Sequence, residues 1–304
     1  MAEDKKIRFL RMPDEYWEPA SKKGRVERLV YKAESLDDES REIVKSVYVY
    51  LPYDYDENIS YDILYYVHGA GSPVENLLND IYDTEFCNVL DNMIQHGDIK
   101  PLIVAAPTFY QEGHHIDSEV TVCWQLADML ADEIYEMVMP AVESRYNSFA
   151  DTVDEEGFSA SRTHRAIGGF SMGGVVMWYV FQRHLNAFSV FLPQSGDSWF
   201  NGMHSGSRHC EEDAADLVNA VRKSGYTPED FSIYMMTGTG DNAYPHLIVQ
   251  SEAMKAHSEI FKFSDTFGEG NFYFNIAFNG IHWYDFAYEY LFNALPLYFP
   301  NAED

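Results

Sequence analysis

The sequence predicts an α/β fold built on a doubly wound, mostly parallel sheet with an antiparallel edge at its N-terminal end. Three observations lead to this fold class. From residue 61 to the C-terminal end, short apolar segments alternate with segments of helical periodicity, which is typical of parallel strands joined by helical crossovers. Before that, two segments of alternating polarity follow each other without a helix between them. Finally, a serine flanked by glycines joins one of the later strands to a helix.

The expected strands differ in polarity, and the difference places them in the sheet. The first two alternate between polar and apolar residues, as an edge with one solvated face does. The next two are almost entirely apolar, which suits central strands that are buried on both faces. In chain order the strands are expected at residues 24–31, 42–50, 61–67, 101–107, 164–168, 187–192, 231–237 and 271–278.

The expected helices lie between the later strands and after the last one. Each has apolar residues at helical spacing, and the second contains Pro140, which is expected to break it. In chain order the helices are expected at residues 81–96, 120–146, 174–181, 211–224, 245–260 and 283–298. This order predicts parallel pairing for the strands that follow the N-terminal edge.

Length and composition are those of a globular protein with a large core. The chain has 304 residues, of which 46% are hydrophobic and 23% charged, and it contains no internal repeat, low-complexity segment or linker. We therefore expect one domain over residues 1–304. No apolar run reaches the roughly 18 residues that a membrane-spanning helix needs, so no membrane segment is expected.

The charge of the chain argues against one class of partner. With 49 acidic and 21 basic residues the formal net charge is −28, which disfavours nucleic acid, because phosphate contacts need lysine and arginine. Long-range repulsion also disfavours a polyanionic substrate, whereas a neutral polysaccharide or a small neutral ester meets no such barrier. The three cysteines, Cys87, Cys123 and Cys210, form no metal-binding or redox motif and are expected as free, mostly buried thiols, with one disulfide bridge as the alternative.

The most informative segment is Gly169-Phe170-Ser171-Met172-Gly173. Two glycines flank a serine at the spacing of a nucleophile elbow, and the segment follows an expected strand and precedes an expected helix. Small residues let strand and helix approach each other, and the helix N-terminus places backbone N–H groups beside the serine. Ser171 is therefore predicted to be a nucleophile, and the backbone N–H of Met172 to stabilise an oxyanion. A glycine- and serine-rich turn without a catalytic role is the alternative.

A serine nucleophile needs a base, and the base needs a carboxylate that orients it. On a doubly wound sheet these groups lie on loops at the carboxyl ends of strands, in the chain order serine, acid, histidine. His282 lies four residues past the last expected strand and is predicted to be the base. Asp241 lies four residues past the preceding expected strand and is predicted to be the acid, with Asp197, one strand earlier, as the alternative.

The second oxyanion donor is expected from the loop after residues 61–67, which reads His68-Gly69-Ala70-Gly71. The backbone N–H of Ala70 is predicted to be this donor, and the two glycines allow the unusual backbone angles of such a loop. His68 is expected to support the loop, because no metal-ligand partner lies at the usual spacing from it. His114-His115 is interpreted as a solvated loop pair, and no metal is expected.

Aromatic residues gather on the loops that are expected to surround the site, where their rings could stack on a phenyl ring or a sugar. The candidate substrate-binding residues are Phe109, Tyr110, Trp124, Trp199, Tyr244 and Trp283. A chain with 22 tyrosines and 20 phenylalanines places aromatic residues throughout, so ordinary packing explains them equally well.

Together these segments resemble the feruloyl and acetylxylan esterases of carbohydrate esterase family 1, which share the α/β-hydrolase fold of esterase D. The resemblance covers about residues 25 to 295, and residues 47–52, 64–71, 165–174, 238–241 and 280–283 carry it. It implies the same nucleophile, base, acid and oxyanion donors that are named above, and it implies no metal and no organic cofactor.

Two departures from the family pattern bear on specificity. Ala70 stands where many relatives carry a bulkier apolar residue, so the acyl pocket is expected to differ. Residues 108–119 and 199–210 match no segment of the family. We expect the choice of substrate to be decided in these two segments.

The sequence thus predicts a serine carboxylester hydrolase that releases ferulate or a related hydroxycinnamate from xylan in plant cell walls through an acyl-enzyme. The expected partner is a feruloylated or acetylated polysaccharide or oligosaccharide. The alternatives are an acetylxylan esterase, an S-formylglutathione hydrolase, an acyltransferase and a carbohydrate-binding module that kept the fold. The resemblance implies an extracellular protein, but residues 1–6 lack the apolar core of a secretion signal, so a cytoplasmic protein is the alternative.

Overall fold

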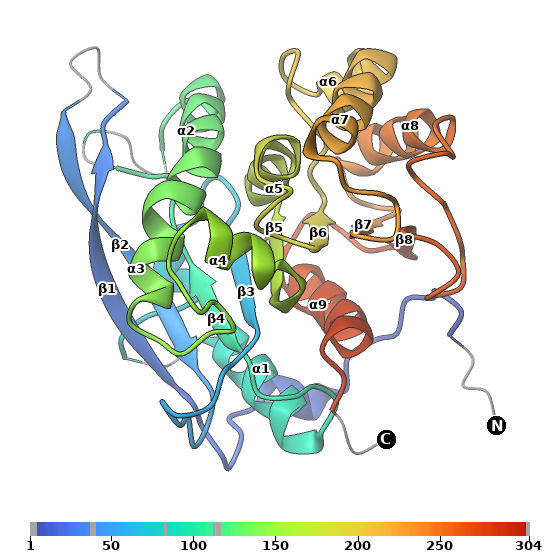
Figure 1. The fold of residues 1–304 in the computed structure, drawn as a ribbon. Coiled ribbons are helices and arrows are strands. Elements are labelled where there is room, and N and C mark those ends of the chain that lie inside the picture. The colour runs from blue at the N-terminus through green and yellow to red at the C-terminus, as the bar shows by residue number, and fades with distance from the viewer. Residues whose placement is uncertain (1–4, 37–40, 82–83, 112, 114–116, 302–304) are drawn as a thin grey trace.

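The computed structural model describes residues 5–36, 41–81, 84–111, 113 and 117–301. Within them, one sheet of eight strands runs through the molecule in the order β1-β2-β4-β3-β5-β6-β7-β8 (Figure 1). The strands are β1 (Arg25–Glu34), β2 (Glu42–Leu51), β3 (Ile63–Val67), β4 (Ile103–Ala106), β5 (Arg165–Phe170), β6 (Val190–Gln194), β7 (Ser232–Gly238) and β8 (Phe272–Ala277). β1 pairs antiparallel with β2, and β2 pairs antiparallel with β4, whereas the other pairs are parallel. The predicted α/β fold with an antiparallel N-terminal edge is therefore confirmed.

Helices cover both faces of this sheet. Residues of α1 and α9 belong to the hydrophobic cluster on one face, and residues of α2, α5, α7 and α8 belong to the cluster on the other (Figure 1). The helices are α1 (Glu85–His96), α2 (Val120–Glu133), α3 (Met139–Glu143), α4 (Glu155–Ala160), α5 (Met172–Arg183), α6 (Ser205–Arg208), α7 (Cys210–Ser224), α8 (Tyr244–Lys255) and α9 (Tyr284–Tyr298).

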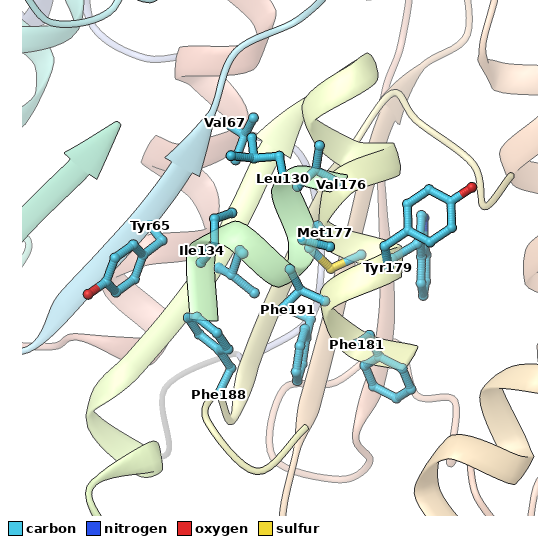
Figure 2. Packing of buried hydrophobic residues seen from close by; sticks show 14 of the residues in the cluster. Tyr65, Val67, Leu130, Ile134, Val176, Met177, Tyr179, Phe181, Phe188 and Phe191 are labelled. Atoms are coloured by element: carbon cyan, nitrogen blue, oxygen red, sulfur yellow. The ribbon is translucent and has the colours of Figure 1, made fainter. Parts of the chain in front are cut away.

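The strand β3 shows how the two faces are built. Its side chains alternate, so that Tyr65 and Val67 belong to the cluster with α2 and α5, whereas Leu64 and Tyr66 belong to the cluster with α1 and α9. All five residues of β3 are buried, which explains why this strand is apolar on both faces. Figure 2 shows Val67 close to Leu130 of α2 and Val176 of α5.

Several element boundaries differ from the expected ones. The helix that was expected to begin at residue 81 begins at Glu85, because the Thr84 side chain accepts from the N–H of Cys87 and caps it. The strand expected at residues 187–192 begins at Val190, since a turn closed by the hydrogen bond from Ala187 to His184 precedes it. The helix expected to reach residue 260 ends at Lys255. The short helices α4 and α6 were not expected at all.

The break that was expected at Pro140 takes a particular form. After α2 the chain continues as a π-helical segment, Ile134–Val138, and α3 then begins at Met139 with Pro140 in its first turn. Helical residues precede Pro140, so its ring crowds the carbonyl four residues back, that of Glu136, which lies in the π-helical segment. The helical segment therefore widens to π-helical geometry ahead of Pro140 and continues past it, so the proline does not end the helix.

Two further expectations concern the whole chain. Cys87, Cys123 and Cys210 form no disulfide bond, and the first two are buried. None of the helices in the described ranges combines the length and the apolar character needed to cross a membrane.

Candidate active site

Ser171 lies on the sharp turn between β5 and α5. Its backbone has φ 56° and ψ −116°, a conformation that residues other than glycine rarely adopt, and its N–H donates to the carbonyl oxygen of Gln194 at 2.8 Å. Ser171 is partly exposed, although β5 before it and most of α5 after it are buried. A strained and accessible serine on such a turn is typical of a nucleophile that must reach a substrate.

The glycines of the motif permit this turn by letting strand and helix approach closely. A Cβ atom on Gly173 would lie 2.0 Å from the carbonyl oxygen of Val67, so a side chain there would force α5 away from β3. A Cβ atom on Gly169 would lie 2.5 Å from the carbonyl carbon of Gly173. Any larger residue at either position would displace the turn that carries Ser171.

The structure brings Ser171, His282 and Asp241 together in one hydrogen-bonded chain. The Nε2 atom of His282 lies 2.9 Å from Oγ of Ser171, and its Nδ1 atom lies 2.8 Å from Oδ1 of Asp241. Because an ionised carboxylate only accepts, Nδ1 carries the proton, and Nε2 is left with the lone pair that accepts from the Ser171 hydroxyl. This arrangement can take the proton from the serine oxygen as it attacks a carbonyl carbon.

The surroundings of the imidazole and the carboxylate differ. Asp241 follows β7 and is 4% exposed, and its Oδ1 atom also accepts from the N–H of Ala243 at 2.7 Å. Its Oδ2 atom is buried and has no hydrogen-bond partner within the described ranges. His282 follows β8, its side chain is 29% exposed, and its ring centroid lies 4.6 Å from that of Phe170. The base is therefore accessible while the carboxylate behind it is shielded from water.

Asp197, the alternative acid, does not contact His282. One of its carboxylate oxygens accepts from the indole N–H of Trp199 at 3.1 Å and pairs with Nδ1 of His204 at 2.9 Å. Asp285, one helical turn after His282, is exposed. Asp241 is thus the carboxylate that orients the imidazole in this structure.

The loop after β3 lies directly beside the serine. A Cβ atom on Gly69 would be 3.2 Å from the Cβ atom of Ser171 and 3.3 Å from the carbonyl oxygen of Phe170. No backbone acceptor in the part of the chain that the structure describes contacts the N–H of Ala70 or that of Met172, the first residue of α5. Their predicted role as oxyanion donors stays a prediction, and these positions support it.

Two tyrosine hydroxyls hold this loop in place. Tyr284 accepts from the N–H of Gly69 at 2.9 Å, and Tyr110 accepts from the N–H of Gly71 at 2.8 Å. Burial raises the pKa of Tyr110 to about 12 and also raises the pKa of Tyr284, so both hydroxyls stay protonated at neutral pH. The sequence places both tyrosines among the aromatic residues on the loops around the site, but their anchoring role was missed.

His68 supports the same loop, as expected. It is fully buried, and burial lowers its pKa to about 4, so the imidazole is neutral at pH 7. Its Nδ1 atom lies 2.8 Å from the carbonyl oxygen of Gly69, and its Nε2 atom lies 2.8 Å from the hydroxyl of Thr108. His114 and His115 lie outside the described residues.

The aromatic candidates for substrate binding divide by their exposure. Phe109 is 1% exposed with its ring centroid 4.4 Å from that of His68, and Tyr110 is 8% exposed with its hydroxyl on the loop. Trp199 is 5% exposed and lies edge-on to half-buried Trp124, with ring centroids 6.3 Å apart. Phe109, Tyr110 and Trp199 are therefore packed inside the protein in this structure, which leaves little of their rings for a ligand.

Trp283 and Tyr244 remain open to a ligand. Trp283 follows the catalytic candidate His282 and is 62% exposed. Tyr244 is half-buried at the first position of α8, and its N–H donates to the carbonyl oxygen of Asp241 at 3.1 Å. Trp283 is the residue after His282 and Tyr244 donates to Asp241, so both stay candidates for contact with a substrate ring, as does half-buried Trp124.

Comparison with known proteins places the chain among esterases. A family model described as "Putative esterase" matches residues 44–293. Endo-1,4-beta-xylanase Y of Acetivibrio thermocellus is 33% identical over 293 residues, which cover 96% of this chain and 25% of that protein. An endo-1,4-beta-xylanase/feruloyl esterase of Xylanibacter ruminicola is 26% identical over 240 residues, which cover 77% of this chain and 27% of that protein. The chain thus spans about a quarter of the length of these curated relatives.

Solved structures give the same result. A serine-to-alanine mutant of the feruloyl esterase module from Clostridium thermocellum, complexed with sinapinate, is 33% identical with a TM-score of 0.81, and the match covers 99% of this chain and 96% of that chain. A ferulic acid esterase from Anaeromyces mucronatus in complex with ferulic acid has a TM-score of 0.67 at 19% identity, covering 94% of this chain and 95% of that chain, and it shares the fold.

Proposed function

The chain belongs to the esterase family and is a carboxylic ester hydrolase, and we propose that it releases ferulate or a related hydroxycinnamate from xylan through an acyl-enzyme. The observation that carries the proposal is the hydrogen-bonded chain from Ser171 through His282 to Asp241, with contacts of 2.9 and 2.8 Å. All three residues lie inside the segment that the family model matches. Their roles as nucleophile, base and acid are part of the proposal.

In the acylation step, Oγ of Ser171 attacks the ester carbonyl carbon while Nε2 of His282 takes the hydroxyl proton. The carbonyl oxygen becomes an oxyanion, and the N–H groups of Met172 and Ala70 donate to it. Asp241 holds the imidazole in position and stabilises its protonated form. When the tetrahedral intermediate collapses, Nε2 returns the proton to the sugar oxygen, which leaves as an alcohol.

In the deacylation step, the hydroxycinnamoyl group is held as an ester on Ser171. A water molecule enters where the alcohol left, and Nε2 of His282 takes its proton as it attacks the carbonyl carbon. Collapse of the second tetrahedral intermediate breaks the bond to Oγ, releases the carboxylic acid and returns the proton to Ser171. The site therefore ends in the state in which it began.

The substrate class rests on the relatives and on the charge. The similar module was solved with sinapinate, which is a hydroxycinnamate, and both curated relatives are named as xylanases. A net charge of −28 favours a neutral polysaccharide over an anionic thioester substrate. Because xylan is a polymer of plant cell walls, we also propose that the enzyme acts outside the cell.

A substrate panel tests the proposal. Values of kcat/KM are measured for methyl ferulate, methyl p-coumarate, acetylated xylan and S-formylglutathione, with Ser171→Ala as the inactive form and Ser144→Ala, an exposed serine of α3's C-terminal turn, as the matched control. We expect the two hydroxycinnamate esters to be preferred at least tenfold, and Ser171→Ala to lose roughly 10³-fold or more in rate. Preferred release of acetate from xylan, or equal turnover by Ser171→Ala, would overturn it.

A further inference from the structure

A second group of chemically reactive side chains lies outside the chain of Ser171, His282 and Asp241. Asp197 on the loop after β6, His204 just before α6 and His246 in the first turn of α8 each offer one ligand atom, and these atoms lie within 4.8 Å of one another. Asp197 is buried, and the two histidines are half-buried. The proposed esterase mechanism uses none of these three side chains.

We propose that Asp197, His204 and His246 form a binding site for a divalent transition-metal ion, with Zn²⁺ as the ion that the donor set favours. Two imidazole nitrogens and one carboxylate oxygen are ligands that zinc binds in proteins. Zinc with bonds of about 2.0–2.1 Å in tetrahedral geometry holds its ligand atoms about 3.4 Å apart, so the side chains have to rotate to bring these three atoms, which lie within 4.8 Å of one another, around one ion. Water or another small ligand completes the coordination.

The carboxylate of Asp197 supplies the first independent support. One oxygen accepts from Trp199 and pairs with His204, but the other oxygen, Oδ2, is buried and has no hydrogen-bond partner within the described ranges. The residue is only 1% exposed. A buried carboxylate oxygen without a donor is costly, and a cation bound to Oδ2 would satisfy it.

The hydrogen bonds around His246 supply the second independent support for the metal site. Oγ of Ser207 lies 2.7 Å from Nδ1 of His246 and 3.1 Å from the carbonyl oxygen of His204, to which its hydroxyl can donate. In the tautomer in which Nδ1 of His246 donates to Ser207, Nε2 keeps a lone pair for a metal ion. A hydrogen bond on one ring nitrogen that orients the other is the usual support for a metal-binding histidine.

The two imidazoles are stacked face to face in this structure. The rings of His204 and His246 are nearly parallel, at 11°, with centroids 4.0 Å apart, and Trp199 lies edge-on to His204 at 4.8 Å. Asp197 and His204 lie on the connection from β6 to α6, whereas His246 lies on α8. A bound ion therefore links this connection to the helix that begins three residues after Asp241.

Calorimetric titration of the EDTA-treated, dialysed protein with Zn²⁺ tests the site. We expect one equivalent of tightly bound Zn²⁺, and at least tenfold weaker binding in His204→Ala and in His246→Ala. Ser207→Ala, which removes only the hydroxyl that orients His246, should also weaken binding. Circular dichroism shows whether each variant keeps its fold, and Co²⁺ gives a spectroscopic readout, because four-coordinate Co²⁺ absorbs strongly in the visible range.

Two control variants separate this site from other histidines. His209→Ala removes an exposed histidine whose Nδ1 atom lies 3.4 Å from a carboxylate oxygen of Glu212, and His282→Ala removes the imidazole beside Ser171. Both should keep the bound equivalent of Zn²⁺. The proposal is overturned if the wild type binds no equivalent of Zn²⁺, if binding is the same in folded His204→Ala and His246→Ala, or if only His282→Ala abolishes it.

Discussion

Gly69 lies beside Ser171 with no room for a side chain between them, although the two residues follow different strands. A Cβ atom built on Gly69 would lie 3.2 Å from the Cβ atom of Ser171, closer than ordinary van der Waals contact. Tyr284 holds the N–H of Gly69 at 2.9 Å, so the loop has little freedom to move away. The distance between the serine and the proposed donor at Ala70 therefore depends on a glycine at position 69.

Replacing this glycine by alanine should slow the reaction. In Gly69→Ala, the added methyl group would displace the loop or the serine by a few tenths of an ångström, and we expect kcat for methyl ferulate to fall about tenfold or more. Gly268→Ala is the matched control, because Gly268 has φ 89° and no atom near its Cβ position. That variant should lose stability but keep its kcat, and equal kcat values for both variants would argue against the role of the loop.

Removing the charge of Asp241 should lower the rate without unfolding the protein. Asp241→Asn keeps the size of the side chain but no longer holds His282 with a charged acceptor, and we expect kcat to fall roughly 10²- to 10⁴-fold. Asp285 is exposed and lies three residues after His282, so kcat of Asp285→Asn should stay within about twofold of the wild-type value. Steady-state kinetics with methyl ferulate measures both, and a wild-type rate for Asp241→Asn would exclude it as the acid.

The pH dependence of stability should contain a contribution from His68. Burial lowers its pKa from 6.5 to about 4, so the folded state binds fewer protons than the unfolded state between these values. The contribution of neutral His68 to the free energy of unfolding is present in full above pH 6.5. It decreases as the pH falls, by about 2–3 kcal/mol between pH 7 and pH 4.5. Urea denaturation at both pH values should show a correspondingly smaller difference for His68→Gln, whose amide does not titrate. The same difference in both proteins would contradict this assignment.

Trp283 should affect binding of aromatic esters more than the chemistry. Trp283 is 62% exposed and follows His282 in the chain. Loss of one aromatic contact with the substrate costs about 0.5–1.5 kcal/mol of binding free energy. Trp283→Ala should therefore raise KM for methyl ferulate about two- to tenfold while leaving kcat for ethyl acetate, which has no ring, unchanged. Phe149→Ala, which removes a 39% exposed ring that stacks on His164, should change neither value. An unchanged KM in Trp283→Ala would remove it from the substrate-binding residues.

The fold could be predicted where the pattern of residues reflects burial on two faces. β3 is apolar throughout because α1, α9, α2 and α5 cover it, and this pattern is visible in the sequence. Boundaries that depend on single hydrogen bonds were missed, such as the start of α1 at the cap formed by Thr84. The helix α6 has four residues, too few for helical periodicity to show.

The proposed catalytic residues could be predicted because the fold assigns them places in the chain. Ser171 lies in a local motif, and Asp241 and His282 each follow a strand, so strand positions sufficed to select them. The aromatic residues could not be sorted in this way, since Phe109 in the core and Trp283 at the surface are equally apolar in sequence. His204 and His246 lie far apart in the chain without a ligand motif, and only the packing of α8 against the connection after β6 brings them together.

Intact-mass and peptide mass spectrometry after reaction with a fluorophosphonate test the central claim, that His282 activates Ser171 for attack on an ester. The wild type should gain one adduct on the peptide that contains Ser171, in parallel with loss of methyl ferulate hydrolysis, and His282→Ala should react far more slowly. Full esterase activity in a protein that carries no adduct on Ser171, or an adduct on a different serine that accompanies the loss of activity, would contradict the account.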